Sequence, residues 1–160
     1  MFPIATRGTL WISGAIAAVL FVWMAIYLRS LGGLGILRLQ FTFSESGFRR
    51  AVEKWSPQTL ARFKTALIID VAFLCAYAVF GYTLGARTCA DATTPLARIA
   101  PWLPPAAALA DLGEDVLQHR LLRDPSAHLP GIAYALAGAC ALTKWVLIVV
   151  FVLVAMRCCQ

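Results

Sequence analysis

The sequence predicts an all-α protein embedded in a membrane as a four-helix bundle, with one amphipathic interfacial helix in the first loop. Of the 160 residues, 61% are hydrophobic and only 14% are charged, whereas soluble domains carry about 25% charged residues. The apolar residues lie in long blocks, which is the pattern of membrane-spanning helices. We therefore expect a single integral membrane domain over residues 1–160, with the lipid bilayer as its main partner.

Four blocks are long enough to cross a hydrocarbon core about 30 Å thick. They cover about residues 10–28, 66–84, 101–122 and 131–156. The first block is longer than the apolar part of an ordinary signal peptide and no strongly basic region precedes it, so we expect a retained helix. Ser56 and Pro57 form a helix-start signal before the second block. Residues 85–100, between the second and third blocks, are expected to form a loop.

The connection between the first two spans contains an amphipathic stretch. Ser44 is a candidate N-cap, and Phe48, Val52 and Trp55 follow at spacings that place them on one helical face. Such a helix either lies in the lipid headgroup region or packs over the end of the bundle. Residues 39–43, just before it, alternate apolar and polar side chains, but a single strand would have nothing to pair with, so we expect irregular structure.

The distribution of positive charge predicts the orientation. The chain has 14 Lys and Arg residues against 8 Asp and Glu, an excess that in a soluble protein would suggest nucleic-acid binding. Here the basic residues flank the spans, where the positive-inside rule and anionic lipids account for them, so no nucleic-acid partner is expected. Nine fall on one predicted side, seven of them within residues 29–64, and four fall on the other. We expect both termini outside and the long basic loop in the cytoplasm.

Three of the five cysteines, Cys89, Cys158 and Cys159, fall on the predicted outer side. In an oxidising compartment Cys89 could form a disulfide with Cys158 or with Cys159. The alternatives are three unpaired thiols or, if the orientation is reversed, a lipidated C-terminal pair of Cys158 and Cys159. The sequence contains no CxxC pair, which argues against a structural zinc site.

A polar face interrupts the third span. Asp111, Glu114, Asp115 and Gln118 recur at i, i+3, i+4 and i+7 and therefore lie on one face of a helix. Charged side chains are costly inside a bilayer, so such residues indicate a functional site and must face the bundle interior or a wet cavity.

The neighbouring spans are expected to complete this polar cluster. Lys144 lies about midway along the fourth span, at the depth of Asp111, so we predict an ion pair between them. The second span carries Asp70 and Tyr77, which are seven residues apart and share a face. Asp70 should lie closer to Asp115 than to Asp111.

The cluster is short of positive charge, since four carboxyl groups face one lysine. Arg62, His119 and Arg120 could reach in from the interface. Otherwise some carboxyl groups keep their protons, or a cation or cationic ligand completes the site. We therefore predict a transport or carrier protein that binds a proton, a cation or a polar small molecule. The predicted ligand-binding residues are Asp70, Tyr77, Asp111, Glu114, Asp115, Gln118 and Lys144.

Two alternatives remain. In an intramembrane enzyme acting on a lipid headgroup, oxygen ligands from Asp70, Asp111, Glu114 and Asp115 would hold a divalent cation. In a structural subunit, the polar face would be buried against a homo-oligomer or membrane-complex partner. A cavity open to one side favours the first two functions, and a dry, fully paired cluster favours the third.

Short motifs in three spans resemble those of small bacterial four-span membrane proteins without assigned function. They are Asp70-x-x-Phe73-x-x-x-Tyr77, the D-x-x-E-D pattern of residues 111–115, and Lys144-Trp145. The resemblance covers residues 37–150, with Asp115 at a position where that pattern has Asn. The resemblance implies no particular activity. We expect the protein to lie in a bacterial inner membrane.

Overall fold

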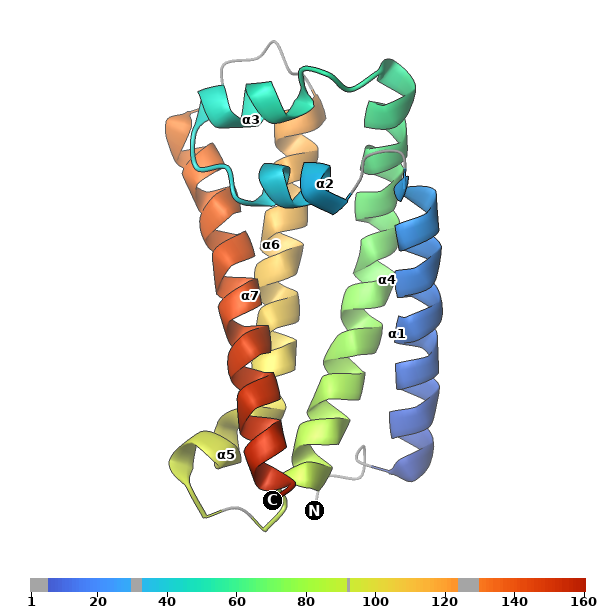
Figure 1. The fold of residues 1–160 in the computed structure, drawn as a ribbon, viewed down its shortest axis with the longest axis vertical. Helices are drawn as coiled ribbons and strands as arrows, with labels where there is room; N and C mark the ends of the chain where they lie inside the picture. The colour runs from blue at the N-terminus through green and yellow to red at the C-terminus, as the bar shows by residue number, and fades with distance from the viewer. Residues whose placement is uncertain (1–5, 30–32, 92, 124–129) are drawn as a thin grey trace.

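The computed structural model describes residues 6–29, 33–91, 93–123 and 130–160 and is helical, without strands, over these residues (Figure 1). The helices are α1 (Arg7–Tyr27), α2 (Gly33–Gln40), α3 (Glu45–Val52), α4 (Pro57–Thr88), α5 (Pro95–Ile99), the 3-10 helix η2 (Ala100–Trp102), α6 (Leu103–Arg123) and α7 (Gly131–Cys158).

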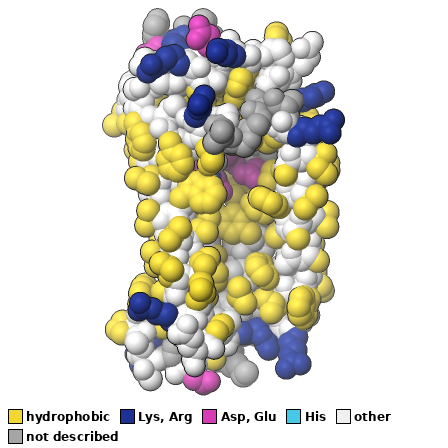
Figure 2. Space-filling model, in the orientation of Figure 1, with side chains coloured by type: hydrophobic (Ala, Val, Ile, Leu, Met, Phe, Trp, Pro, Cys, Tyr) yellow, Lys and Arg dark blue, Asp and Glu magenta, His cyan; other side chains and the backbone are white. Residues whose placement is uncertain are grey.

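Three described helices, α1, α4 and α7, are long and apolar enough to cross a membrane. The predicted third span, residues 101–122, corresponds to α6, which has 21 residues like α1. The polar face described above includes Asp111, Glu114 and Asp115, and these three acidic residues lower the mean hydropathy of α6. Figure 2 shows an apolar band around the middle of the visible face, with basic side chains toward both ends.

The long helices follow one another in space in the order α7, α6, α4 and α1, because α6 packs against both α7 and α4, while α1 packs along α4 (Figure 1). Glycines allow α4 to approach both α6 and the 3-10 helix η2 closely. A Cβ atom added at Gly81 would lie 2.4 Å from Cβ of Pro104, and one added at Gly85 would lie 3.0 Å from Cα of Pro101. Small residues at helix contacts let backbones approach in this way.

Local signals set the start of α4, and the helix extends further than predicted. The Ser56 hydroxyl accepts a hydrogen bond from the Thr59 backbone N–H, and Pro57 occupies the first helical position. The helix continues to Thr88, beyond the predicted apolar limit at residue 84. The next residue, Cys89, is the C-cap of α4 and forms the disulfide described below.

Two segments that were predicted to be irregular are in part helical, so these predictions were wrong there. Residues 39 and 40, expected to be irregular, belong to α2, in which Leu39 is only 1% exposed and joins a hydrophobic cluster with Phe48. Burial of this leucine offsets the low helix propensity of the nearby glycines. The expected loop over residues 85–100 contains α5, which Thr94 caps ahead of Pro95.

Tertiary packing decides between the two alternatives for α3. Ser44 caps the helix as predicted. Phe48 is 4% exposed, and its ring contacts that of Tyr134 in α7 with a centroid distance of 5.5 Å. Val52 and Trp55 pack against the same cluster. The predicted apolar face is therefore directed into the protein, and α3 packs over the end of the helices.

A disulfide joins the C-terminal ends of α4 and α7. Cys89, at the end of α4, is bonded to Cys158, at the end of α7, whereas Cys159 is free and exposed. The bridge lies beside the buried side chains of Ala97 and Ala100. It therefore fixes α4 and α7 to each other at the end of the molecule opposite α3 (Figure 1).

Candidate functional site

The predicted polar residues converge from α4, α6 and α7. The α6 helix contributes Asp111, Glu114, Asp115 and Gln118, all buried, in keeping with their spacing on one helical face. Lys144 of α7 is also buried, at 4% exposure. From α4 come Asp70 and Tyr77, which are half-buried.

Lys144 holds two carboxylates of α6 at once. Its Nζ lies 2.6 Å from Oδ1 of Asp111 and 2.7 Å from Oε2 of Glu114. Nε2 of Gln118 donates a hydrogen bond of 2.6 Å to the other Glu114 oxygen, Oε1. The predicted ion pair between Asp111 and Lys144 is thus part of a wider buried network, and both oxygens of Glu114 are engaged.

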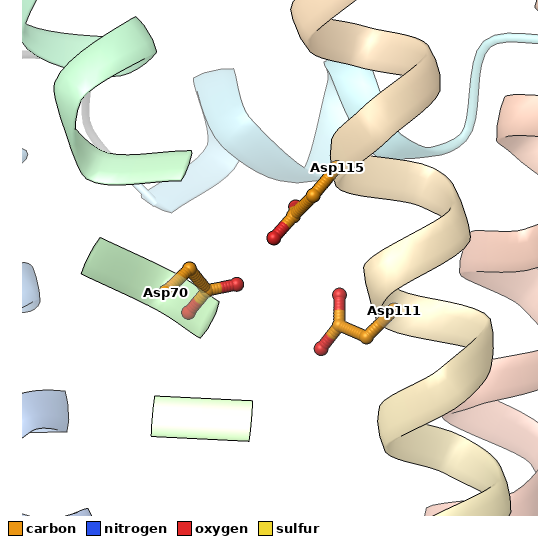
Figure 3. A group of neighbouring side chains, drawn as sticks. All are labelled: Asp70, Asp111 and Asp115. Carbon is orange, nitrogen blue, oxygen red and sulfur yellow. The ribbon is translucent and has the colours of Figure 1, made fainter. Parts of the chain in front are cut away.

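A second group of carboxylates lies between α4 and α6. Oxygens of Asp70, Asp111 and Asp115 all lie within 4.8 Å of one another, and the three side chains point toward a common centre (Figure 3). Asp70 of α4 and Asp115 of α6 therefore face each other across the contact between these two helices.

Two buried oxygens, one in this second group and one beside it, lack hydrogen-bond partners among the described residues. Oδ2 of Asp115 and the hydroxyl oxygen of Tyr77 make no hydrogen bond there. Asp115 is only 7% exposed, so its free oxygen has little contact with bulk solvent. An unsatisfied buried polar group is costly, and the unpaired oxygen therefore makes Asp115 a candidate ligand-binding residue.

A cavity of about 670 Å³ adjoins the carboxylates. Its walls come from α1, α2, α4, α6 and α7, and its polar lining includes Asp70, Asp111, Asp115, Gln118 and Lys144. Figure 2 shows acidic side chains at the bottom of a hollow in an otherwise apolar face. The polar cluster is therefore accessible from the side of the molecule.

The structure separates Glu114 from the other residues that were predicted to bind a ligand. Glu114 does not line the cavity and is turned toward Lys144 and Gln118, so the group of oxygens close enough to share a metal ion is Asp70, Asp111 and Asp115 without it. The three basic residues that could have reached in from the interface, Arg62, His119 and Arg120, are exposed. Among the described residues, Lys144 is the one basic side chain that is buried in the cluster.

Sequence reasoning did not assign site roles to several residues that line the cavity. Phe73 lies one turn from Asp70 on the same face of α4, and its spacing could have identified it. Gln40 of α2 accepts a hydrogen bond of 3.4 Å from Nε1 of Trp145 in α7. No local pattern links two residues so far apart in the chain.

The sequence matches no protein-family model, and comparison with curated proteins and with solved structures finds no significant match. Fold and site together define an all-helical protein with three helices apolar enough to span a membrane and a buried acidic site beside a cavity. Function is therefore inferred from the geometry of this site.

Proposed function

We propose that the chain is a small integral membrane protein in which the carboxylate–lysine cluster binds a proton, a cation or a polar small molecule, in a transport or carrier role. The main support is the free Oδ2 of Asp115, a buried carboxylate oxygen without a partner among the described residues, at the wall of the 670 Å³ cavity. Lys144 is engaged by Asp111 and Glu114. Asp70 and Asp115 are therefore the carboxyl groups of the cluster that can bind a proton or an incoming cation.

Membrane embedding of all four long helices as one domain belongs to the same proposal. It is supported by α6 lying between α4 and α7, two of the three helices apolar enough to span. The acidic face of α6 is buried, whereas Leu109 and Val116 on its other side are exposed. In lipid, this arrangement keeps charge inside the protein and presents apolar side chains to the hydrocarbon.

The proposed orientation in a bacterial inner membrane places both termini outside and α2 and α3 in the cytoplasm. The α2–α3 end carries most of the basic residues beside the spans, and the Cys89–Cys158 disulfide at the opposite end suits an oxidising compartment. We expect a membrane-impermeant maleimide added to intact cells to label Cys159, which is free and exposed.

The Cys159→Ser variant is the control, and we expect it to lose this labelling, because the other described free thiols, Cys75 and Cys140, lie within the long helices. Labelling of Cys159 that appears only after the cells are permeabilised would reverse the proposed orientation.

The carrier role predicts that cation movement depends on Asp115. In proteoliposomes on a supported membrane, a jump in cation concentration or in pH should give a transient current. We expect Asp115→Asn to reduce this current by about tenfold or more, because removing one charge of a buried cation site weakens binding by at least that factor. The matched control is Asp91→Asn, an exposed acid outside the cluster.

A protein-dependent current that survives unchanged in Asp115→Asn would contradict this role for the cluster. Detergent-purified variants should first be compared by size-exclusion chromatography, so that loss of current is not mistaken for loss of fold.

A second candidate is a metal-dependent enzyme acting on a lipid headgroup. One observation favours it: the oxygens of Asp70, Asp111 and Asp115 lie within 4.8 Å of one another, and carboxylate oxygens suit divalent ions such as Mg²⁺. A response confined to divalent cations in the same current measurement, together with turnover of added phospholipid, would favour this candidate over the carrier.

A further inference from the structure

We infer that the ligand of this site is a lipophilic organic cation, a positively charged group on an apolar body, which enters the cavity from the side facing the bilayer. The inference rests on the proposed function and specifies its substrate class. It is carried by the free oxygen of Asp115 together with the size, lining and opening of the cavity.

The cavity is too large and too apolar for an inorganic ion alone. Its volume of about 670 Å³ falls in the range of pockets that bury small organic molecules, about 300–1,000 Å³. Twelve of its nineteen lining residues are aliphatic or aromatic. A metal ion held by the three aspartates would leave most of this apolar surface without a partner, whereas an organic body would cover it.

Three aspartates, Asp70, Asp111 and Asp115, line the cavity together with the basic residues Lys144 and Arg29. The aspartates favour a cation as the ligand. Asp70 and Asp115 are the acidic pair that Lys144 does not contact, since its ammonium group is held by Asp111 and Glu114. The Oδ2 of Asp115, on a side chain that is 7% exposed and lines the cavity, has no hydrogen-bond partner among the described residues. An anion at this position would meet three carboxyl groups, from Asp70, Asp111 and Asp115.

Aromatic rings lie next to the carboxylates along α4. Phe73 and Tyr77 follow Asp70 by three and seven residues, and their ring centroids are 5.2 Å apart. Phe21 of α1 extends the row, at 6.2 Å from Phe73, and all three rings line the cavity. Aromatic faces attract organic cations through the ring quadrupole, so the row contacts both the charge and the apolar body of such a ligand.

The opening of the cavity fits a route from the bilayer. Figure 2 shows the hollow in the apolar band rather than at either charged end of the molecule. With α1, α4 and α7 spanning the bilayer, this face meets hydrocarbon. A lipophilic cation already dissolved in the membrane would reach the carboxylates without crossing the basic α2–α3 end.

The test uses two probes of the same shape and opposite charge, tetraphenylphosphonium and tetraphenylborate, titrated into the full chain in lipid nanodiscs by calorimetry, with empty nanodiscs subtracted. We expect saturable binding of the phosphonium and none of the borate. Asp115→Asn and Asp70→Asn should each weaken phosphonium binding by about tenfold or more, and Asp91→Asn should leave it unchanged. Phe73→Leu, which removes the ring but keeps an apolar side chain, should weaken it by about threefold or more.

Equal binding of the two probes, or phosphonium binding insensitive to Asp115→Asn, overturns the inference. So does the absence of phosphonium binding in a protein that still gives the Asp115-dependent current with inorganic cations or protons; in that case the proposed function stands and only the ligand class is wrong. If neither phosphonium binding nor an Asp115-dependent current is found, the inference and the proposed function fail together.

Discussion

Replacing Lys144 with methionine is expected to destabilise the folded chain by about 3–5 kcal/mol, the cost of removing one partner from a buried ion pair. Lys144 Nζ lies 2.6 Å from Asp111 and 2.7 Å from Glu114, and all three residues are less than 9% exposed. Without the ammonium group, the two carboxyl groups lose their shared countercharge. The measurement is thermal unfolding of the detergent-purified protein, followed by far-ultraviolet circular dichroism.

Two further variants make the Lys144 result specific. Lys54→Met changes an exposed lysine between α3 and α4 and should leave the unfolding temperature nearly unchanged. Combining Lys144→Met with Asp111→Asn and Glu114→Gln removes the uncompensated charges, so we expect it to recover most of the lost stability. If Lys144→Met unfolds at the same temperature as Lys54→Met, the buried ion network does not stabilise the protein.

The second large effect is expected at Gly81, where α4 meets the beginning of α6. The Cβ of an alanine at this position would lie 2.4 Å from Cβ and 2.5 Å from Cγ of Pro104. The proline ring is rigid and cannot rotate away, so the two helices must separate. We expect Gly81→Ala to destabilise the protein by about 1–3 kcal/mol, the usual cost of overpacking a contact, measured by the same thermal unfolding.

Gly113→Ala is the matched control, in the middle of α6. The closest atom to its added Cβ is Sγ of Cys140 at 3.3 Å, the end of a side chain that can change rotamer. Its unfolding temperature should therefore fall less than that of Gly81→Ala. The reverse order would show that the α4–α6 contact at Gly81 and Pro104 tolerates separation and does not set the helix spacing.

Some of the site was predictable because it depends on helical periodicity alone. The spacing of Asp111, Glu114, Asp115 and Gln118 places them on one face, and the structure buries that face. The equal depth of Asp111 and Lys144 follows from two antiparallel helices joined by a short connection, and their side chains meet.

Other parts of the site depend on how each helix is rotated about its own axis, which no local pattern encodes. Glu114 and Asp115 are adjacent in sequence, so their side chains diverge by about 100° around α6. The first is turned to Lys144 and the second to Asp70 and the cavity. The same angle separates Cys158 from Cys159, and the structure pairs Cys158 with Cys89.

By itself, the sequence determined the helical class, the long apolar segments, the helix starts at Ser44 and Ser56, and the acidic face of α6. These features follow from hydrophobic periodicity and capping, which act over a few turns of one helix. The tertiary structure decided the helix α2, the packing of α3 over the bundle end, which carboxylates face Lys144 and which face Asp70, and the position of the cavity. Those features depend on close contacts between distant segments, such as Gly81 with Pro104 and Phe48 with Tyr134, because side-chain packing fixes the separation and rotation of neighbouring helices.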